Sequence, residues 1–232
     1  MPFAIATGHA LTTEAAENIL RAGGTAVDAL VAAAFTAFVA EPILAGPLGG
    51  GAALIEEPGK APAILDAFVQ TPRRKAPEAD LDLETITVDF GAETQDFHIG
   101  AATIATPCLI PALSDLHARL GRIPLPELAA QAVAHARQGH IVTAFQSHVL
   151  HLVGPIIESA PAPKALYGGE TLLTPGQTLR NPQLADVLET LALEGPRFFT
   201  EGEIAQALIA LPGGHLSLED LRHAAPVRRQ PL

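Results

Sequence analysis

The chain has little cysteine, few aromatic residues and few basic residues. Its one cysteine, Cys108, excludes an internal disulfide and a thiolate-rich metal site. Without Trp and with one Tyr, the core of this 232-residue chain must consist of aliphatic and small side chains. Only 14 Lys and Arg stand against 25 Asp and Glu. The net charge of −11 offers no basic stripe for phosphates, so we expect no nucleic-acid partner.

A membrane-spanning run and an export signal are also missing from this sequence. The longest apolar run, residues 29–40, is shorter than the roughly 20 residues that span a bilayer. Residues 1–14 contain no basic segment followed by an apolar stretch of signal-peptide length. We therefore expect no membrane partner and a cytoplasmic location, or a periplasmic or secreted one if an upstream segment has been removed.

The first part of the chain predicts two helices. One begins at Thr12 or Thr13, natural N-caps, and ends at the pair Gly23-Gly24. The next segment is apolar all round except at Asp28 and Thr36, which predicts a helix buried on every face. Asp28 is expected to cap this helix or to pair internally, a structural role.

The rest of the chain predicts a mixture of short strands and further helices. A turn at Pro58-Gly59 joins two strand-like runs into a hairpin, and alternation in 78–106 indicates more strands. Ser217 and Asp220 form a near capping box. Helices are expected at 109–121, 126–139, 143–159 and 182–195, with a Pro-rich loop at 160–177.

Several patterns resemble sites of known chemistry but lack a required part. Gly49–Gly51 precedes a strand and lacks the Lys-Ser/Thr of a phosphate loop, so close backbone packing explains it better. His148 and His151 have zinc-like spacing, with His135 and His140 upstream, but no matching carboxylate or thiolate. We expect solvated or capping histidines, and neither a metal nor a cofactor.

Three further candidates are weaker still. The alternating acids of 80–84 lack the central Gly and later Glu of a calcium loop, so we interpret them as the exposed side of an edge segment. Ser114, Asp115 and His117 are too close along one helix to converge as a catalytic triad. Cys108 is expected to be a small buried hydrophobic residue rather than a nucleophile.

Four stretches, taken in order, are far more specific. They read TEAAENILRAGGTAVDALVAAAF, EPILAGPLGGGAALI, RQGHIVTA and LEGPRFFTEGEIAQALIALPGGHLSLEDLRHAAPVRRQPL. Together they resemble the large subunit of the γ-glutamyltransferase (γ-glutamyltranspeptidase) family of N-terminal-nucleophile hydrolases. The family's Gly-Gly-Asn-Ala-Val-Asp-Ala, glycine-rich, Gly-Thr-Pro-Gly and closing Gly-Gly-x-Leu-x-x-Glu-Asp-Leu motifs correspond to Gly23–Ala29, Leu48–Ala52, Ala105–Cys108 and Gly213–Leu221.

The resemblance implies an α+β fold, the four-layer αββα sandwich of N-terminal-nucleophile hydrolases. Residues 1–232 would form a single domain, the large-subunit portion, helix-rich with a short-stranded sheet. In the family, autocatalytic cleavage exposes an N-terminal Thr on a small subunit, and this Thr attacks a γ-glutamyl amide. Neither that Thr nor the oxyanion glycines are in this chain, so the resemblance implies no catalytic residue here and an obligate small-subunit partner.

The family's substrate clamp is altered in this sequence. In the family, the strand after the glycine segment ends in Asp-Phe-Arg-Glu-x-Ala-Pro, and its Arg binds the α-carboxylate of the substrate. Aligning Asp66 and Pro72 with this pattern places Phe68 at the Arg position and Val69 at the Glu position. The resemblance therefore implies a small-molecule amide substrate with non-standard acyl recognition.

Three interpretations of the change remain open. Arg73 or Arg74 could reach back and supply the missing charge. The pocket could instead be apolar and select an acyl group without an amino-acid carboxylate. Alternatively, glutamyl recognition is lost and Arg73–Lys75 are a solvated bend.

Two functions follow from these alternatives. The first is the large subunit of a γ-glutamyltransferase-like amidohydrolase or acyltransferase, with Phe68, Arg73 and Arg74 as candidate substrate-binding residues. The second is a degenerate or truncated member of the family that acts as a scaffold or partner-binding protein.

Overall fold

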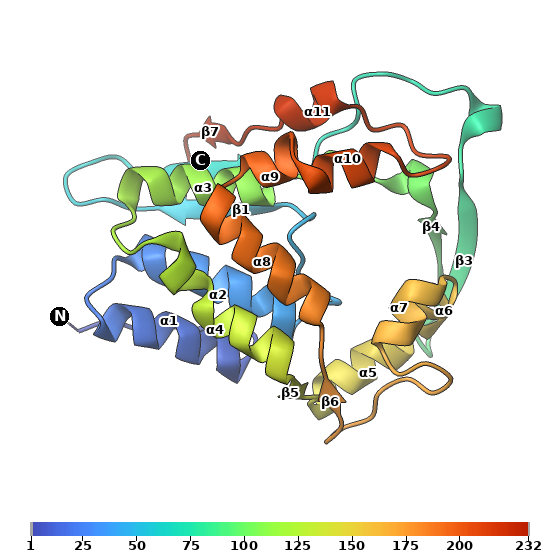
Figure 1. Ribbon diagram of the computed structural model, residues 1–232, viewed down its shortest axis with the longest axis horizontal. Helices are drawn as coiled ribbons and strands as arrows, with labels where there is room; N and C mark the ends of the chain where they lie inside the picture. The colour runs from blue at the N-terminus through green and yellow to red at the C-terminus, as the bar shows by residue number, and fades with distance from the viewer. Residues whose placement is uncertain (1, 232) are drawn as a thin grey trace.

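The computed structural model describes residues 2–231 (Figure 1). Helices predominate, and the strands form small antiparallel sheets. The helices are α1 Ala10–Arg21, α2 Ala26–Ala40, α3 Leu109–Leu120, α4 Leu125–Gln138, α5 Ala144–Leu152, α6 Gly154–Glu158, α7 Pro161–Leu166, α8 Pro182–Glu194, α9 Arg197–Thr200, α10 Glu203–Ile209 and α11 Leu218–Arg222. The strands are β1 Gly51–Ile55, β2 Ala63–Ala67, β3 Glu84–Asp89, β4 Thr94–Ile99, β5 His140–Ile141, β6 Thr178–Leu179 and β7 Val227–Arg229.

Helix α2 is the centre of the core. It packs against α1, α3 and α4, and α8 packs in turn on α4. Its Phe35 and Phe38 side chains are buried within one apolar cluster that extends to α4 and α8. The expected burial on every face is confirmed except at Ala26, which is exposed, and at Leu30, which is 42% exposed.

The ends of α1 differ from the sequence prediction at one point. The N-cap is His9, not Thr12 or Thr13, because the His9 Nδ1 accepts a hydrogen bond from the Leu11 N–H at 3.1 Å. An imidazole can replace the hydroxyl of a usual cap, and the helix therefore begins earlier. The predicted stop is confirmed, since Gly23 has a φ of +90°.

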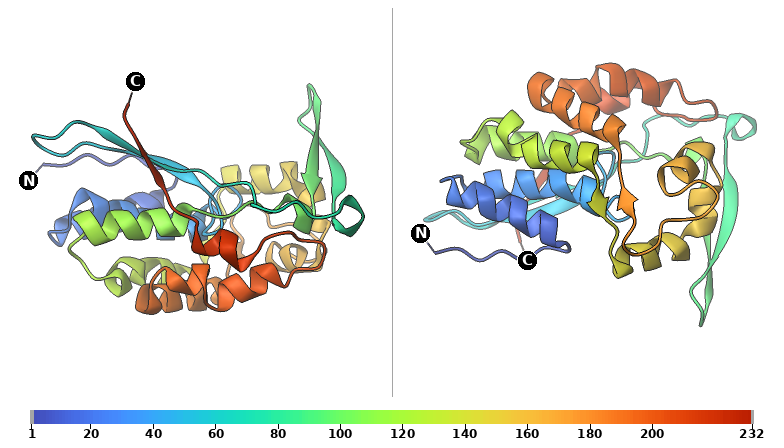
Figure 2. Two further views of the ribbon diagram at one scale, coloured as in Figure 1. Left: turned by 90° about the horizontal axis from the view of Figure 1, so that it is seen from above. Right: turned by 60° about the horizontal axis from the view of Figure 1, so that its bottom comes forward.

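The main sheet has the order β1-β2-β7, with both pairs antiparallel. One face of the sheet packs on α3: Leu65 and Ala67 of β2 contact Ala112 and Leu116. The left view of Figure 2 shows the helices on that side of the sheet only. The other face, named here the open face, carries Ala52, Leu54, Ile64, Asp66, Val227 and Arg229.

Two further predictions need correction, and two others are confirmed. The expected helix over 143–159 is two helices, α5 and α6, because Gly154-Pro155 interrupts it, and the expected loop contains α7. The acids of 80–84 are exposed as expected, and the Asp82 carboxylate also accepts the Ala101 N–H at 2.9 Å. The strands expected in 78–106 exist as the β3–β4 hairpin, which projects from the body in Figure 2.

Within residues 2–231, no helix combines the length and the apolar character needed to cross a bilayer.

Candidate functional site

The end of β2 brings together a carboxylate, a guanidinium group and an exposed aromatic ring. The Asp66 Oδ1 accepts the Phe68 N–H at 3.0 Å, and its Oδ2 accepts the Arg229 Nε–H at 2.7 Å. Both hydrogen bonds lower the pKa of Asp66, and the one from the Phe68 backbone has the larger effect. The carboxylate thus has two hydrogen-bond partners, and it fixes the backbone at Phe68.

The glycine segment packs closely against the backbone at this strand end. A Cβ on Gly50 would lie 2.6 Å from the Val69 N and 3.0 Å from the Phe68 Cα, so only glycine allows this close approach. The Gly49 carbonyl accepts the N–H groups of Cys108 and Leu109, at 3.3 and 3.2 Å. The predicted packing role of the glycines is confirmed, and the turn also holds the start of α3.

The surroundings of this strand end are apolar and uncovered. Phe68 and Leu54 are each 70% exposed, and Val227 is 46% exposed. All three lie on or beside the open face, next to the Asp66–Arg229 pair. Exposed apolar surface next to an ion pair is typical of a surface that binds a protein partner or a ligand.

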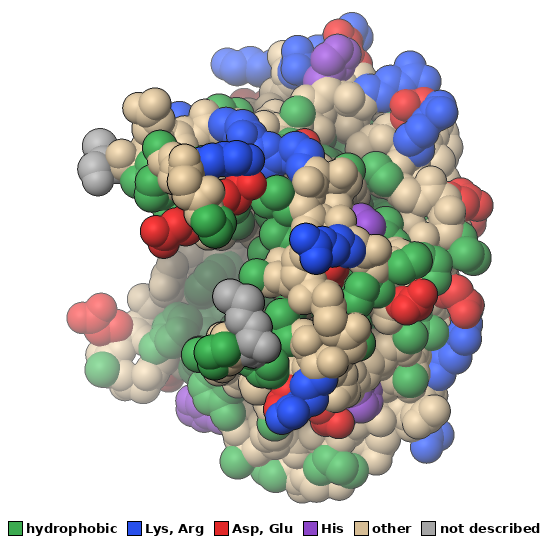
Figure 3. All heavy atoms as spheres, turned by 90° about the vertical axis from the view of Figure 1, so that its left-hand side faces the viewer, with side chains coloured by type: hydrophobic (Ala, Val, Ile, Leu, Met, Phe, Trp, Pro, Cys, Tyr) green, Lys and Arg blue, Asp and Glu red, His purple; other side chains and the backbone are tan. Residues whose placement is uncertain are grey.

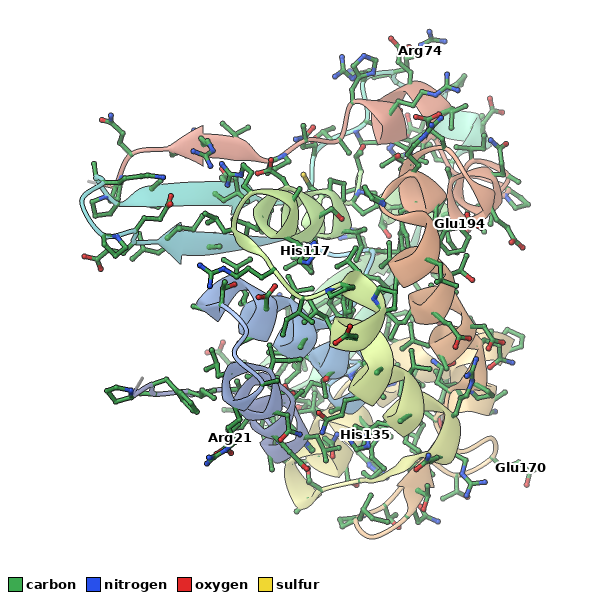
Figure 4. The ribbon with its side chains drawn as sticks, turned by 60° about the vertical axis from the view of Figure 1, so that its left-hand side comes forward. Arg21, Arg74, His117, His135, Glu170 and Glu194 are labelled. Atoms are coloured by element: carbon green, nitrogen blue, oxygen red, sulfur yellow. The ribbon has the colours of Figure 1, made fainter. Side chains whose placement is uncertain are left out.

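Arg73 and Arg74 are directed to a different element. The Arg73 N–H donates to the Asp220 Oδ1 at 2.8 Å, and the Arg74 Nη2 lies 3.4 Å from the Glu219 Oε2. Both acids are on α11, and Figure 4 shows Arg74 at the outer edge of the molecule beside that helix. The structure therefore brings Arg73 and Arg74 together at α11 and leaves the Phe68 ring by itself.

Asp220 explains why the bend is fixed. Burial alone would raise its pKa, but hydrogen bonds from Ser217 and the Arg73 N–H outweigh burial and lower the pKa. Ser217 and Asp220 form a complete capping box, which confirms the predicted cap of α11. The cap thus also anchors the segment that follows β2.

The other candidates take structural positions. Cys108 is buried, and burial followed by the charge of Asp66 raises the pKa of its thiol, which disfavours a thiolate. Asp115 pairs with Arg119 at 3.2 Å and the His117 Nε2 contacts the Ile123 carbonyl, so no triad forms. In the part of the chain that the structure describes, no three His, Cys, Asp or Glu side chains are placed to hold a metal ion.

Arg229 is the residue of this site that sequence reasoning did not find. It lies 163 positions from Asp66, and only the antiparallel pairing of β7 with β2 brings the two together. Arg229 lies in the fourth of the stretches that resemble the family, beyond the motif that ends at Leu221, and nothing in the local spacing assigns it a partner.

Comparisons with known proteins give the class and then the family. Solved N-terminal-nucleophile hydrolases match the whole fold, among them γ-glutamyltranspeptidase from Pseudomonas nitroreducens complexed with L-DON, with a TM-score of 0.83 and 28% identity. That match covers 99% of this chain and 67% of the solved chain. The chain belongs to the gamma-glutamyltranspeptidase family, whose model matches residues 12–232.

Two curated relatives are 30% identical to this chain over the aligned residues. The acylase ACY 1 proenzyme of Pseudomonas sp. (strain SE83) is 30% identical over 236 residues, which cover 98% of this chain and 42% of the relative. The glutathione hydrolase proenzyme of Pseudomonas aeruginosa is 30% identical over 89% of this chain and 36% of the relative. The chain therefore spans less than half the length of these relatives.

Proposed function

We propose that this chain is the large-subunit part of a hydrolase or acyltransferase of the γ-glutamyltranspeptidase family. In this proposal residues 1–232 form one domain, and a small subunit with an N-terminal Thr completes the site. The Thr hydroxyl attacks the substrate amide, and its own α-amine takes the proton. Two relatives named as proenzymes support a protein that is cut from a longer precursor.

The open face supports a companion subunit. It presents Leu54 and Val227 to solvent beside Phe68, whereas Leu65 and Ala67 on the opposite face of the sheet pack on α3. A second sheet laid on this face would bury the apolar side chains and produce the double-sheet core of an αββα sandwich. It would also bring a catalytic Thr near the end of β2.

We further propose that the acyl site is apolar where other family members carry a carboxylate clamp. Phe68 is the observation that carries this proposal, because its ring is 70% exposed at the clamp position. The guanidinium group on the same face of the sheet, that of Arg229, is already bound to Asp66. An acyl group without an α-carboxylate fits such a site better than a γ-glutamyl group.

The alternative of a relocated clamp is weaker. Arg74 is paired with Glu219, and Arg73 is tied through its backbone to Asp220, so both positions are anchored on α11. Moving the Arg74 side chain to the end of β2 would break its ion pair with Glu219, and the backbone contact of Arg73 holds the start of its side chain at α11. In this proposal Arg73 and Arg74 are part of a surface bend and do not bind the substrate.

Two measurements test the proposal in order. Intact-mass spectrometry with N-terminal sequencing of the purified protein should reveal a second chain beginning with Thr. A folded 24.1 kDa chain alone and monodisperse would instead support the scaffold alternative.

The substrate test compares γ-glutamyl-p-nitroanilide with butanoyl-p-nitroanilide, which lacks the α-amino and α-carboxyl groups. We expect kcat/KM to favour the butanoyl substrate, and Phe68→Arg to shift the ratio towards γ-glutamyl by about tenfold or more, since a guanidinium–carboxylate pair is strong. Phe90→Arg, which adds the same charge at an exposed Phe on the β3–β4 hairpin, is the matched control. Loss of γ-glutamyl turnover in Arg73→Ala or Arg74→Ala would show a relocated clamp and refute the apolar site.

A further inference from the structure

A cleft lies on the helix side of the main sheet. It has a volume of about 700 Å³ and is bounded by α3, α9, α11 and β7. Leu65, Pro111 and Leu125 contribute apolar surface, and Arg222 and Arg228 contribute the two positive charges. The mixture of an apolar floor and a few polar groups is typical of a site for a small molecule.

The strand register separates this cleft from the end of β2 where Phe68 lies. Arg228 is the partner of Leu65 in the β2–β7 pair, so both side chains point to the side of the sheet that faces α3. Asp66 and Arg229 point to the other side, onto the open face. A ligand in the cleft would therefore not occupy the acyl site proposed above.

The acidic residues closest to Arg222 along the chain are bound to other residues. On the same helix, Glu219 pairs with Arg74, and Asp220 accepts hydrogen bonds from Ser217 and the Arg73 N–H. Both carboxylates of α11 are thus turned towards the bend after β2. Among residues 2–231, the Arg222 guanidinium makes no ion pair or hydrogen bond.

The same is true of Arg228. The acid nearest to it on the neighbouring strand, Asp66, is bound to Arg229 at 2.7 Å. The one carboxylate that lines the cleft, Asp115, is bound to Arg119 at 3.2 Å. Within the described part of the chain, Arg228 also lacks an ion-pair partner, although the protein carries a net charge of −11.

Two unpaired guanidinium groups around one cleft define the ligand chemistry. We propose that this cleft binds a small molecule with a doubly negative group, either a phosphate monoester or a dicarboxylate, between Arg222 and Arg228. Planar guanidinium groups bind both kinds of anion through paired N–H donors. The hydroxyls of Ser114 and Thr200, which also line the cleft, supply further donors, and the apolar floor takes the body of the ligand.

The two arginines of the cleft suit a charged ligand. In an otherwise acidic protein, their unpaired charges attract anions locally. Figure 3 shows one face of the molecule, on which basic and acidic side chains are interspersed and Lys and Arg are the more numerous in the upper part.

Isothermal titration calorimetry with two probes tests this proposal on the purified protein, with its companion chain if one is present. Inorganic phosphate and glutarate are titrated separately at pH 7.5 and low salt. We expect saturable binding of at least one probe, and the double variant Arg222→Gln/Arg228→Gln should weaken it about tenfold or more, because two charge-assisted contacts are lost. Binding of phosphate alone assigns a phosphate monoester, and binding of glutarate alone assigns a dicarboxylate.

The control is Arg21→Gln, which removes one charge from α1, far from the cleft in Figure 4. It should leave the affinity unchanged within about twofold, since exposed charges at long range are screened. Thermal unfolding of every variant shows whether it is folded. The proposal is overturned if neither probe binds saturably, if the double variant binds as well as the parent chain, or if Arg21→Gln weakens binding equally.

Discussion

Two aspartates, one on each side of the molecule, have very different surroundings. Asp28 is 0% exposed, and its carboxylate accepts N–H groups of Thr25, Arg122 and Ile123. Asp66 lies on the open face, where its only side-chain partner among residues 2–231 is Arg229. The helical layer thus satisfies its buried charge from within the chain, whereas the sheet keeps its charge at the surface.

The apolar residues show the same contrast. The helical layer buries its large side chains around α2, α4 and α8 in one continuous cluster. The sheet buries only one face, and Leu54 and Val227 remain exposed on the other. We infer that the helical layer is complete as a folding unit and that the sheet is half of a core, which agrees with a chain that spans less than half the length of its relatives.

The largest effect is expected at Asp28. Asp28→Ala removes the capping box of α2 and leaves the partly buried N–H groups of Arg122 and Ile123 without their acceptor. The free energy of unfolding should fall by about 4 kcal/mol, which urea denaturation followed by circular dichroism measures.

Asp66→Ala is the matched control, since it removes the same carboxylate from the open face. It should leave the urea midpoint nearly unchanged. Equal losses in the two variants would mean that the two sides of the molecule do not differ as proposed.

The next effect is a loss of stability in acid that arises at His140. The ring is 6% exposed, and burial, followed by the charges of His9 and His135, lowers its pKa to about 4 from 6.5. Because the unfolded chain binds the proton more readily, stability falls as the pH drops from about 6.5 to about 4, by roughly 3 kcal/mol in total. Urea unfolding at a series of pH values measures this slope.

His140→Leu should flatten the pH dependence in that window. His98→Gln, at an exposed position of β4, should leave it as it is. If the slope survives in His140→Leu, another group is responsible and the assignment to His140 is wrong.

The sequence predicted local structure better than it predicted distant pairing. Thr25 and Asp28 are three residues apart, so the cap of α2 could be inferred from spacing, as could Gly23 as the stop of α1. The pairing of Asp66 with Arg229 depends on strand order, which no local pattern contains. The His9 cap was missed because imidazole is an uncommon capping group.

The smallest effect is expected on the open face itself. Leu54→Ser should change the free energy of unfolding of the isolated chain by about 0.5 kcal/mol or less, because its side chain is already in water in this chain. Leu65→Ala, on the packed face of the same sheet, should cost about 2–5 kcal/mol by leaving a cavity against α3. In the assembled protein the order changes: Leu54→Ser should then loosen the companion chain, measured as faster dissociation in sedimentation or native mass spectrometry. If Leu54→Ser destabilises the isolated chain as much as Leu65→Ala does, Leu54 is already packed, and the sheet has no free face for a second subunit.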